Sequence, residues 1–207
     1  DMSNVLSMDG MFRGASSFSQ TVQFWDISKV RSLRGTFDGA SEFDRPLARW
    51  DVSGVTDMTR LFAGAARFNQ PIRGWDVSPV VTMDSAFDGA IAFNKPIDVW
   101  LTSSLRSLHR TFAGAVAFAQ PLGWDSSRVT DFSHAFDGAT SFNGPFIGDW
   151  DTSAANDMSY MFRSASTFNA NVSHWDVSLV RSMRSMFERA EAFDQPVSDW
   201  VVTEAQS

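Results

Sequence analysis

Large apolar residues recur along the chain at a fixed interval. The eight tryptophans are separated by gaps of 25, 25, 25, 24, 26, 25 and 25 residues: Trp25, Trp50, Trp75, Trp100, Trp124, Trp150, Trp175 and Trp200. A phenylalanine follows twelve residues after each of the first seven, and a second stands six residues further on. Such a period is typical of repeat proteins whose units bury their apolar faces against their neighbours. We therefore expect one repeat domain, residues 1–207, with eight units ending near the tryptophans.

The third unit, residues 53–75, carries the pattern of both predicted elements. Its first half has apolar residues three or four apart, the spacing of one helix face: Val55, Met58, Leu61, Phe62 and Ala65. Ser53 stands where a helix N-cap is expected, and Gly64 suits a helix end with positive φ. Trp75 and Val77 alternate with polar residues, as in a strand. The predicted fold is an α/β repeat solenoid with a short strand and a short helix per unit.

The two irregular gaps, before Trp124 and before Trp150, indicate a tolerant loop. Both lie between the second phenylalanine and the tryptophan, because the step from tryptophan to the next phenylalanine is always twelve. A slip inside a packed element would turn its apolar side chains to solvent. We therefore predict a surface loop before each tryptophan.

Net charge, cysteine content and the length of apolar runs exclude several classes of partner and site. The net charge is -7, which disfavours nucleic acid as a partner. There is no cysteine, so disulfides and thiolate chemistry are excluded. No apolar run reaches the roughly 20 residues that span a bilayer, and the first residues show no signal-peptide pattern.

Aspartate follows tryptophan in six units, and we call these residues the aspartate column: Asp26, Asp51, Asp76, Asp125, Asp151 and Asp176. Leu101 and Val201 interrupt it. Stacked carboxylates repel one another unless their charge is offset. Aspartate often accepts backbone N–H bonds at turns, which is the favoured interpretation. A calcium site is the alternative, because calcium takes oxygen ligands, although no DxDxDG spacing occurs.

Arginine is the second candidate for partner binding. Arg60 and six further arginines fall at positions predicted to lie on the outer helix face. The six are the candidates for partner binding: Arg31, Arg34, Arg106, Arg110, Arg181 and Arg184. Mixed pairing with aspartates on a solvated surface is one interpretation. Because arginine favours planar bidentate contacts, a protein partner is the other.

Serine and histidine give no catalytic or metal site. Serine recurs three residues after each of the first seven tryptophans and at the equivalent Ser3, and such redundancy favours N-caps over one activated nucleophile. The three histidines, His109, His134 and His174, lack metal-ligand spacing.

The repeated pattern WDVSxVxxMxxxFxGAxxFNxPIxxW, seen as DVSGVTDMTRLFAGAARFNQPIRGW, resembles the BspA-type leucine-rich-repeat surface proteins. The resemblance covers essentially the whole chain and departs from the pattern at Leu101, Ala155 and Val201. It implies a leucine-rich-repeat-like, right-handed stack of coils, a cell-surface location and a link to adhesion. It supplies no catalytic residues.

Taken together, these features predict a non-enzymatic scaffold, without cofactor, that presents an extended surface to a protein partner or a larger complex. The alternative is a cell-surface adhesion or glycan-binding module, calcium-dependent through the aspartate column. Terminal coils have one neighbour each, so we expect one or both ends to be covered by another chain, by further repeats or by self-association.

Overall fold

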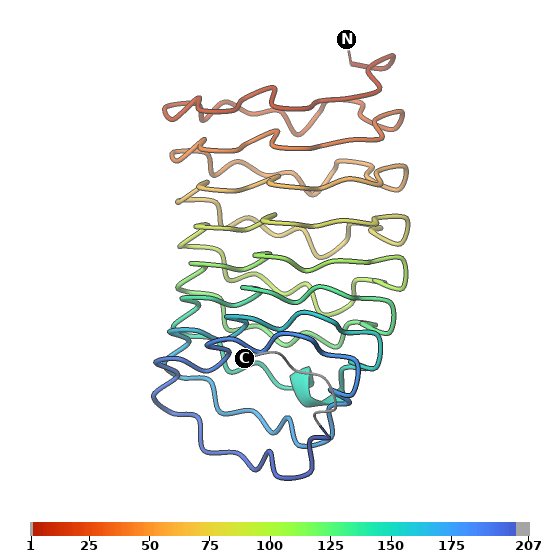
Figure 1. Cartoon of the computed structure of the whole chain (residues 1–207). Helices are drawn as coiled ribbons and strands as arrows, with labels where there is room; N and C mark the ends of the chain where they lie inside the picture. The colour runs from red at the N-terminus through yellow and green to blue at the C-terminus, as the bar shows by residue number, and fades with distance from the viewer. Residues whose placement is uncertain (1, 202–207) are drawn as a thin grey trace.

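The computed structural model describes residues 2–201, over which the chain winds in successive coils that lie one above another (Figure 1). Equivalent residues of neighbouring units lie side by side. Seven isolated parallel β-bridges join them in one column: Ser7 to Ser32, Ser32 to Asp57, Asp57 to Thr82, Thr82 to Ser107, Ser107 to Asp131, Asp131 to Asp157 and Asp157 to Ser182. Each repeat unit therefore forms one coil.

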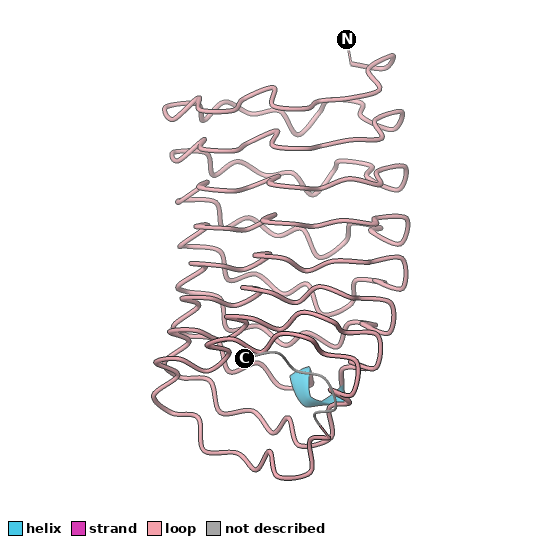
Figure 2. Ribbon diagram, viewed as in Figure 1, coloured by secondary structure: helices cyan, strands magenta, loops and turns pink. Residues whose placement is uncertain are grey.

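The predicted strand and helix are both wrong. Within residues 2–201 there is no α-helix and no β-strand, and the one regular element is the 3₁₀ helix η1, Ile147–Asp149 (Figure 2). This finding overturns the α/β repeat solenoid, and with it the leucine-rich-repeat-like coil that the resemblance implies. Turns and short extended connections build the coils instead.

Backbone N–H groups in the segment predicted as a helix alternate between two kinds of partner. Even-numbered residues of the third unit donate to carbonyls of the next coil at 2.6–3.0 Å: Met58 to Thr82, Arg60 to Asp84, Phe62 to Ala86 and Gly64 to Asp88. The odd-numbered Leu61, Ala63 and Ala65 donate to the carbonyl three residues earlier. A helix would keep these bonds within its own coil. Consecutive turns also place apolar residues about three apart, so they imitate the helical pattern.

We call residues 57–65, and their equivalents in other units, the ladder segment. Two of its positions have left-handed backbone. The first has φ of 50–62°: Gly10, Gly35, Arg60, Ser85, Arg110, His134, Tyr160 and Ser185. The second has φ of 57–73°: Gly14, Gly39, Gly64, Gly89, Gly114, Gly138, Ser164 and Arg189. The positive φ predicted for Gly64 is confirmed, but it interrupts right-handed winding rather than ending a helix.

Aromatic columns fill the centre of the coils. Trp100 is 3% exposed, and its ring stacks on Trp75 at 6.5 Å and on Trp124 at 6.0 Å between centroids. Its Nε1 donates a hydrogen bond to the Ile72 carbonyl of the preceding coil, 3.3 Å away. Both phenylalanine columns stack in the same way, as at Phe37 and Phe62 (5.7 Å). Each aromatic residue therefore joins neighbouring coils as well as filling its own.

Both irregular gaps lie in the segment predicted as a loop. Before Trp124, Gly123 alone separates the tryptophan from the buried Leu122, where the preceding unit has Asp98 and Val99. Before Trp150 the extra residue is Phe146, which adopts φ 71° and immediately precedes η1. We call residues 69–74, and their equivalents, the loop segment.

Candidate interaction surface

Each residue of the aspartate column closes a turn with the serine two positions ahead. Asp51 Oδ1 accepts hydrogen bonds from the Ser53 backbone N–H (3.1 Å) and from Ser53 Oγ (2.6 Å). The backbone bond recurs throughout the column, at Asp26, Asp76, Asp125, Asp151 and Asp176. The turn interpretation of the aspartates is confirmed. The N-cap interpretation of the serines is wrong, because no helix follows them and their groups donate to aspartate.

The column is a line of exposed negative charge. All six carboxylates are solvent exposed. Hydrogen bonds from the serine side chain and backbone lower the pKa of four of them: Asp26, Asp76, Asp125 and Asp176. These carboxylates therefore stay ionised at neutral pH and in mild acid.

The carboxylates do not gather into a metal site. Over residues 2–201, no group of three or more histidine, aspartate or glutamate side chains is placed to hold a metal ion. Calcium takes six to eight oxygen ligands. Because each aspartate of the column stands in its own coil and binds its own serine, any cation would need ligands from elsewhere.

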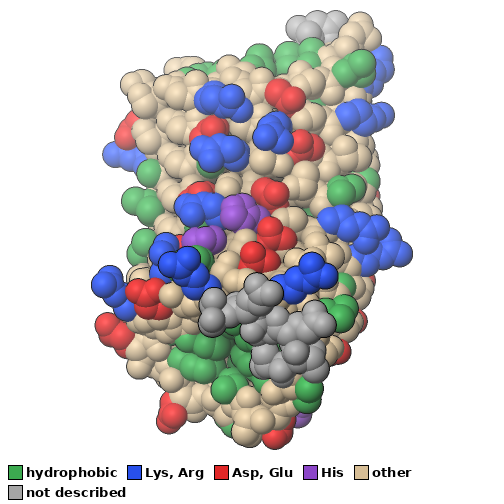
Figure 3. All heavy atoms as spheres, viewed as in Figure 1, with side chains coloured by type: hydrophobic (Ala, Val, Ile, Leu, Met, Phe, Trp, Pro, Cys, Tyr) green, Lys and Arg blue, Asp and Glu red, His purple; other side chains and the backbone are tan. Residues whose placement is uncertain are grey.

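The six predicted arginines do not lie in the aspartate column. In the coils that carry them, a turn separates them from the residue that follows tryptophan. Arg31, Arg106 and Arg181 are exposed at the position just before the β-bridge, not on a helix face. Arg110 forms a bidentate pair with Asp88, with its Nε 2.9 Å from Oδ2, and Arg34 lies 3.7 Å from Asp57. Mixed acidic and basic side chains are visible on the face in Figure 3.

A ring cluster that the sequence reasoning missed spans four successive coils beside these pairs. Tyr160 stacks on His134 with centroids 4.6 Å apart, and His134 meets His109 edge-on at 6.0 Å. Arg163 and Arg184 lie over the Tyr160 ring, 4.8 and 5.7 Å from its centroid. The spacing of His109, His134, Tyr160 and Arg184, each 24 to 26 residues from the next, was the available signal.

Polar bonds fix the histidines of this cluster. His134 Nδ1 lies 2.9 Å from Asp137 Oδ2, and Arg163 binds the same carboxylate. Burial acts to raise the pKa of Asp137, but the bonds from Arg163 and His134 outweigh it and hold that pKa below its ordinary value. These bonds hold His134 and Arg163 in place beside the Tyr160 ring.

One serine in this region lies close to both a histidine and an aspartate. Ser133 Oγ is 2.5 Å from Asp131 Oδ1 and 2.7 Å from His109 Nδ1. In a hydrolytic triad the histidine stands between serine and aspartate. Here Ser133 stands between the other two and is only 5% exposed, and His109 Nδ1 is 3.9 Å from Asp131. The bond between His109 and Ser133 joins neighbouring coils, and the three groups do not have the order of a hydrolytic triad.

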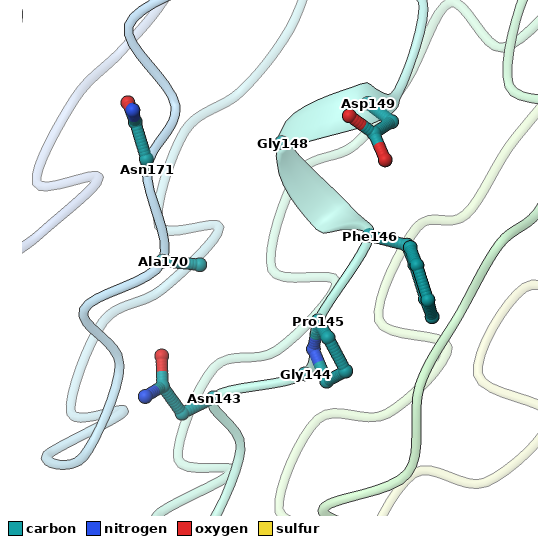
Figure 4. Close-up of a pocket in the computed structure, with 8 residues that line it drawn as sticks. All are labelled: Asn143, Gly144, Pro145, Phe146, Gly148, Asp149, Ala170 and Asn171. Carbon is teal, nitrogen blue, oxygen red and sulfur yellow. The ribbon is translucent and has the colours of Figure 1, made fainter.

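A hollow of about 360 Å³ lies beside η1, where the longer loop segment bulges (Figure 4). Asn143 and Asn171 line it from neighbouring coils, and the 57% exposed ring of Phe146 points away from Asn171. A Cβ at Gly148 would lie 2.2 Å from the Asn171 carbonyl, so glycine is required for the coils to approach there.

No described residues form a helix long and apolar enough to cross a bilayer. The chain matches the family model described as "Mycoplasma protein of unknown function, DUF285" in three segments, residues 1–78, 46–123 and 122–207. Neither a curated protein nor a solved structure matches it. The match leaves the resemblance to BspA-type proteins unconfirmed, but its three segments span the repeats from end to end. The chain therefore belongs to the DUF285 family of repeat-containing proteins of unknown function.

Proposed function

We propose that this chain is a non-enzymatic scaffold that presents an extended surface to another protein. The observation that carries the proposal is the aspartate column, which sets six exposed carboxylates at equivalent positions of the coils. Hydrogen bonds between coils hold these positions in register. Such a repeated row suits a long partner segment better than a small molecule, which needs one enclosed site.

The sign of the charge restricts the partner. With a net charge of -7 and an acidic row on the surface, nucleic acid would be repelled. A protein with a basic surface is favoured electrostatically, and its association rate would fall with added salt.

Replacing carboxylates of the column by amides tests this function. Asp51→Asn, Asp76→Asn and Asp151→Asn together remove charge while an amide oxygen stays in place for the serine. We expect proteins that co-purify stoichiometrically with the native chain to bind this variant at least tenfold more weakly. Sedimentation of the reconstituted pair measures this. Unchanged affinity for every such protein would refute a role for the column.

A calcium-dependent adhesion or glycan-binding module at the cell surface is the second candidate, favoured by the same ionised carboxylates. It differs in requiring a cation. Calorimetric titration with calcium separates the two functions, because absence of heat and of any shift in melting temperature would eliminate the second.

The two end coils support association with further chains or repeats. Their aromatic core residues are only partly buried, whereas the equivalents in central coils are buried: Phe12, Phe18 and Trp25 in one, Phe187, Phe193 and Trp200 in the other. We propose that one or both of these faces are covered by another chain, by further repeats or by a second copy. A monomer in sedimentation across the micromolar range would contradict coverage by a second copy.

A further inference from the structure

The aspartate column is interrupted at one central position by an apolar residue. Leu101 occupies the place that aspartate takes in neighbouring coils, and it is 68% exposed. Val99, two residues earlier, is 48% exposed, while Trp100 between them is buried. Alternation along an extended segment places Val99 and Leu101 on the same side. Two exposed apolar side chains therefore stand together within an otherwise acidic row.

Two hollows, of about 310 and 340 Å³, lie on either side of Leu101, which lines both. The first is also lined by Arg73, Gly74, Trp75, Asp76, Val77 and Val99. The second is also lined by Ser78, Trp100, Thr102, Ser103, Gly123 and Asp125. A Cβ added at Gly74 or at Gly123 would meet no atom within 4 Å. The glycines leave this space open although neither packing nor a left-handed backbone requires them there.

Each hollow has a carboxylate in its lining. Asp76 and Asp125 belong to the coils before and after Leu101, and hydrogen bonds from Ser78 and Ser127 keep both pKa values low. Arg73 also lines the first hollow, but its guanidinium is paired with Asp98 and leaves Asp76 without a basic partner in that hollow. The patch is thus an apolar ridge with an open hollow and an exposed carboxylate on each side. We call it the Leu101 patch, formed by Gly74, Asp76, Val99, Leu101, Gly123 and Asp125.

Charge complementarity selects the occupant. A second copy of the chain docked on the same patch would bring two aspartate columns face to face, which like charges oppose. A purely apolar segment would remove water from Asp76 and Asp125 without pairing them. A segment with both apolar and basic side chains satisfies the hollows and the carboxylates together.

We propose that the Leu101 patch binds an extended segment of another protein in which apolar side chains alternate with arginine or lysine. Its apolar side chains fill the two hollows beside Leu101, and its basic side chains pair with Asp76 and Asp125. The proposal rests on the partner-binding function above and specifies where on the column the partner docks.

A fluorescein-labelled eight-residue peptide of alternating leucine and arginine is the probe, and anisotropy at about 150 mM salt measures its affinity. Leu101→Ser removes apolar area without changing charge and is expected to weaken binding about tenfold. Gly74→Ser and Gly123→Ser fill the hollows and should each weaken it severalfold. Peptides with serine for leucine, or glutamate for arginine, should not bind.

Matched variants distinguish binding at the Leu101 patch from binding elsewhere along the aspartate column. Val116→Ser removes a comparable exposed apolar residue outside the patch (44% exposed) and should leave affinity unchanged. Equal melting temperatures check that each variant folds. If the peptide fails to bind, or binds Leu101→Ser as tightly as the native chain, the patch is not the docking site. If binding instead weakens only in Asp26→Asn combined with Asp51→Asn, the column binds partners and the Leu101 patch does not.

Discussion

The ladder and loop segments of one coil differ in how they are joined to the next coil. The ladder segment uses backbone bonds at every second residue, such as Arg60 N–H to the Asp84 carbonyl. The loop segment uses side chains: Asp44 Oδ1 accepts from the Asn69 backbone N–H (3.0 Å), and Asn69 Oδ1 accepts from that of Asn94 (3.0 Å). Backbone bonds require an unchanged residue count, whereas side chains can be replaced singly. The loop segments therefore hold both changes of length.

The same difference accounts for where distinctive surface features lie. Phe146, Gly74, Gly123 and Val99 all lie at exposed positions of loop segments, where core packing does not determine the residue. In the ladder segments, variety is confined to outward side chains such as those of the ring cluster. A regular frame thus leaves one edge of each coil free to diversify.

The largest effect is expected from an insertion. One glycine placed between Thr59 and Arg60 shifts the ladder register and turns buried side chains outward, so the cooperative thermal transition should be lost. The same glycine can be placed between Pro96 and Ile97, which is the position that Phe146 occupies two coils later. There it should cost only about 1 kcal/mol. Similar melting curves for the two insertions would remove the distinction between the segments.

Truncating a central tryptophan comes next. Trp100→Ala should lower the free energy of unfolding by about 3–5 kcal/mol, because it removes a buried ring that contacts the coils on both sides. Trp100→Phe keeps an aromatic ring, loses the bond to Ile72 and should cost less. Chemical denaturation measures both. A negligible loss in Trp100→Ala would contradict the assigned core role.

Two glycine substitutions, one in the ladder segment and one in the loop segment, should have smaller effects on stability. Gly64 has φ 64°, so Gly64→Ala should destabilise by about 1 kcal/mol. Gly74 lies in a loop segment with open space around it, and Gly74→Ala should be neutral or stabilise by a few tenths of a kcal/mol. Equal effects in denaturant titrations would show that left-handed backbone is not what distinguishes the ladder.

Acid should produce the smallest effect. The pKa of Asp137 in the ladder and that of Asp125 at the column are both lowered on folding. Their stabilisation is therefore complete above the unfolded carboxyl pKa of about 3.9 and is lost as pH falls through the lower folded values. The melting temperature should hold from pH 7 to about pH 5 and then decline. Because Asp137 is only 10% exposed, Asp137→Asn should flatten that decline more than Asp125→Asn. The reverse order would contradict this comparison.

Several features were predictable from the amino-acid pattern because they depend on spacing alone. The aromatic core, the left-handed glycines, the aspartate turns and the tolerant loops all follow from residue type at a fixed offset from tryptophan. The helix prediction failed because tandem turns repeat apolar residues at nearly the same interval. Only the partner of each N–H, its own coil or the next, distinguishes the two.

Contacts between coils were the least predictable part of the surface. Tyr160 and His134 meet because of the register, and their shared offset from tryptophan was the only sign of it. The hollows beside Leu101 depend on glycines whose absent side chains leave no mark in a hydrophobic pattern. Residue types alone therefore indicated the aspartate column and its interruption at Leu101, but not the hollows on either side of it.

The direction of the ladder bonds has a consequence for how the gene can change. Three or four N–H groups of each ladder segment donate to the following coil, and its carbonyls accept the same pattern from the preceding one, so the interior coils present their neighbours with equivalent bonding groups. A recombination event that removes or duplicates 25 residues would join surfaces that already match. We expect natural chains of this kind to differ in length by whole coils, and their reach between partners to lengthen in steps of one coil.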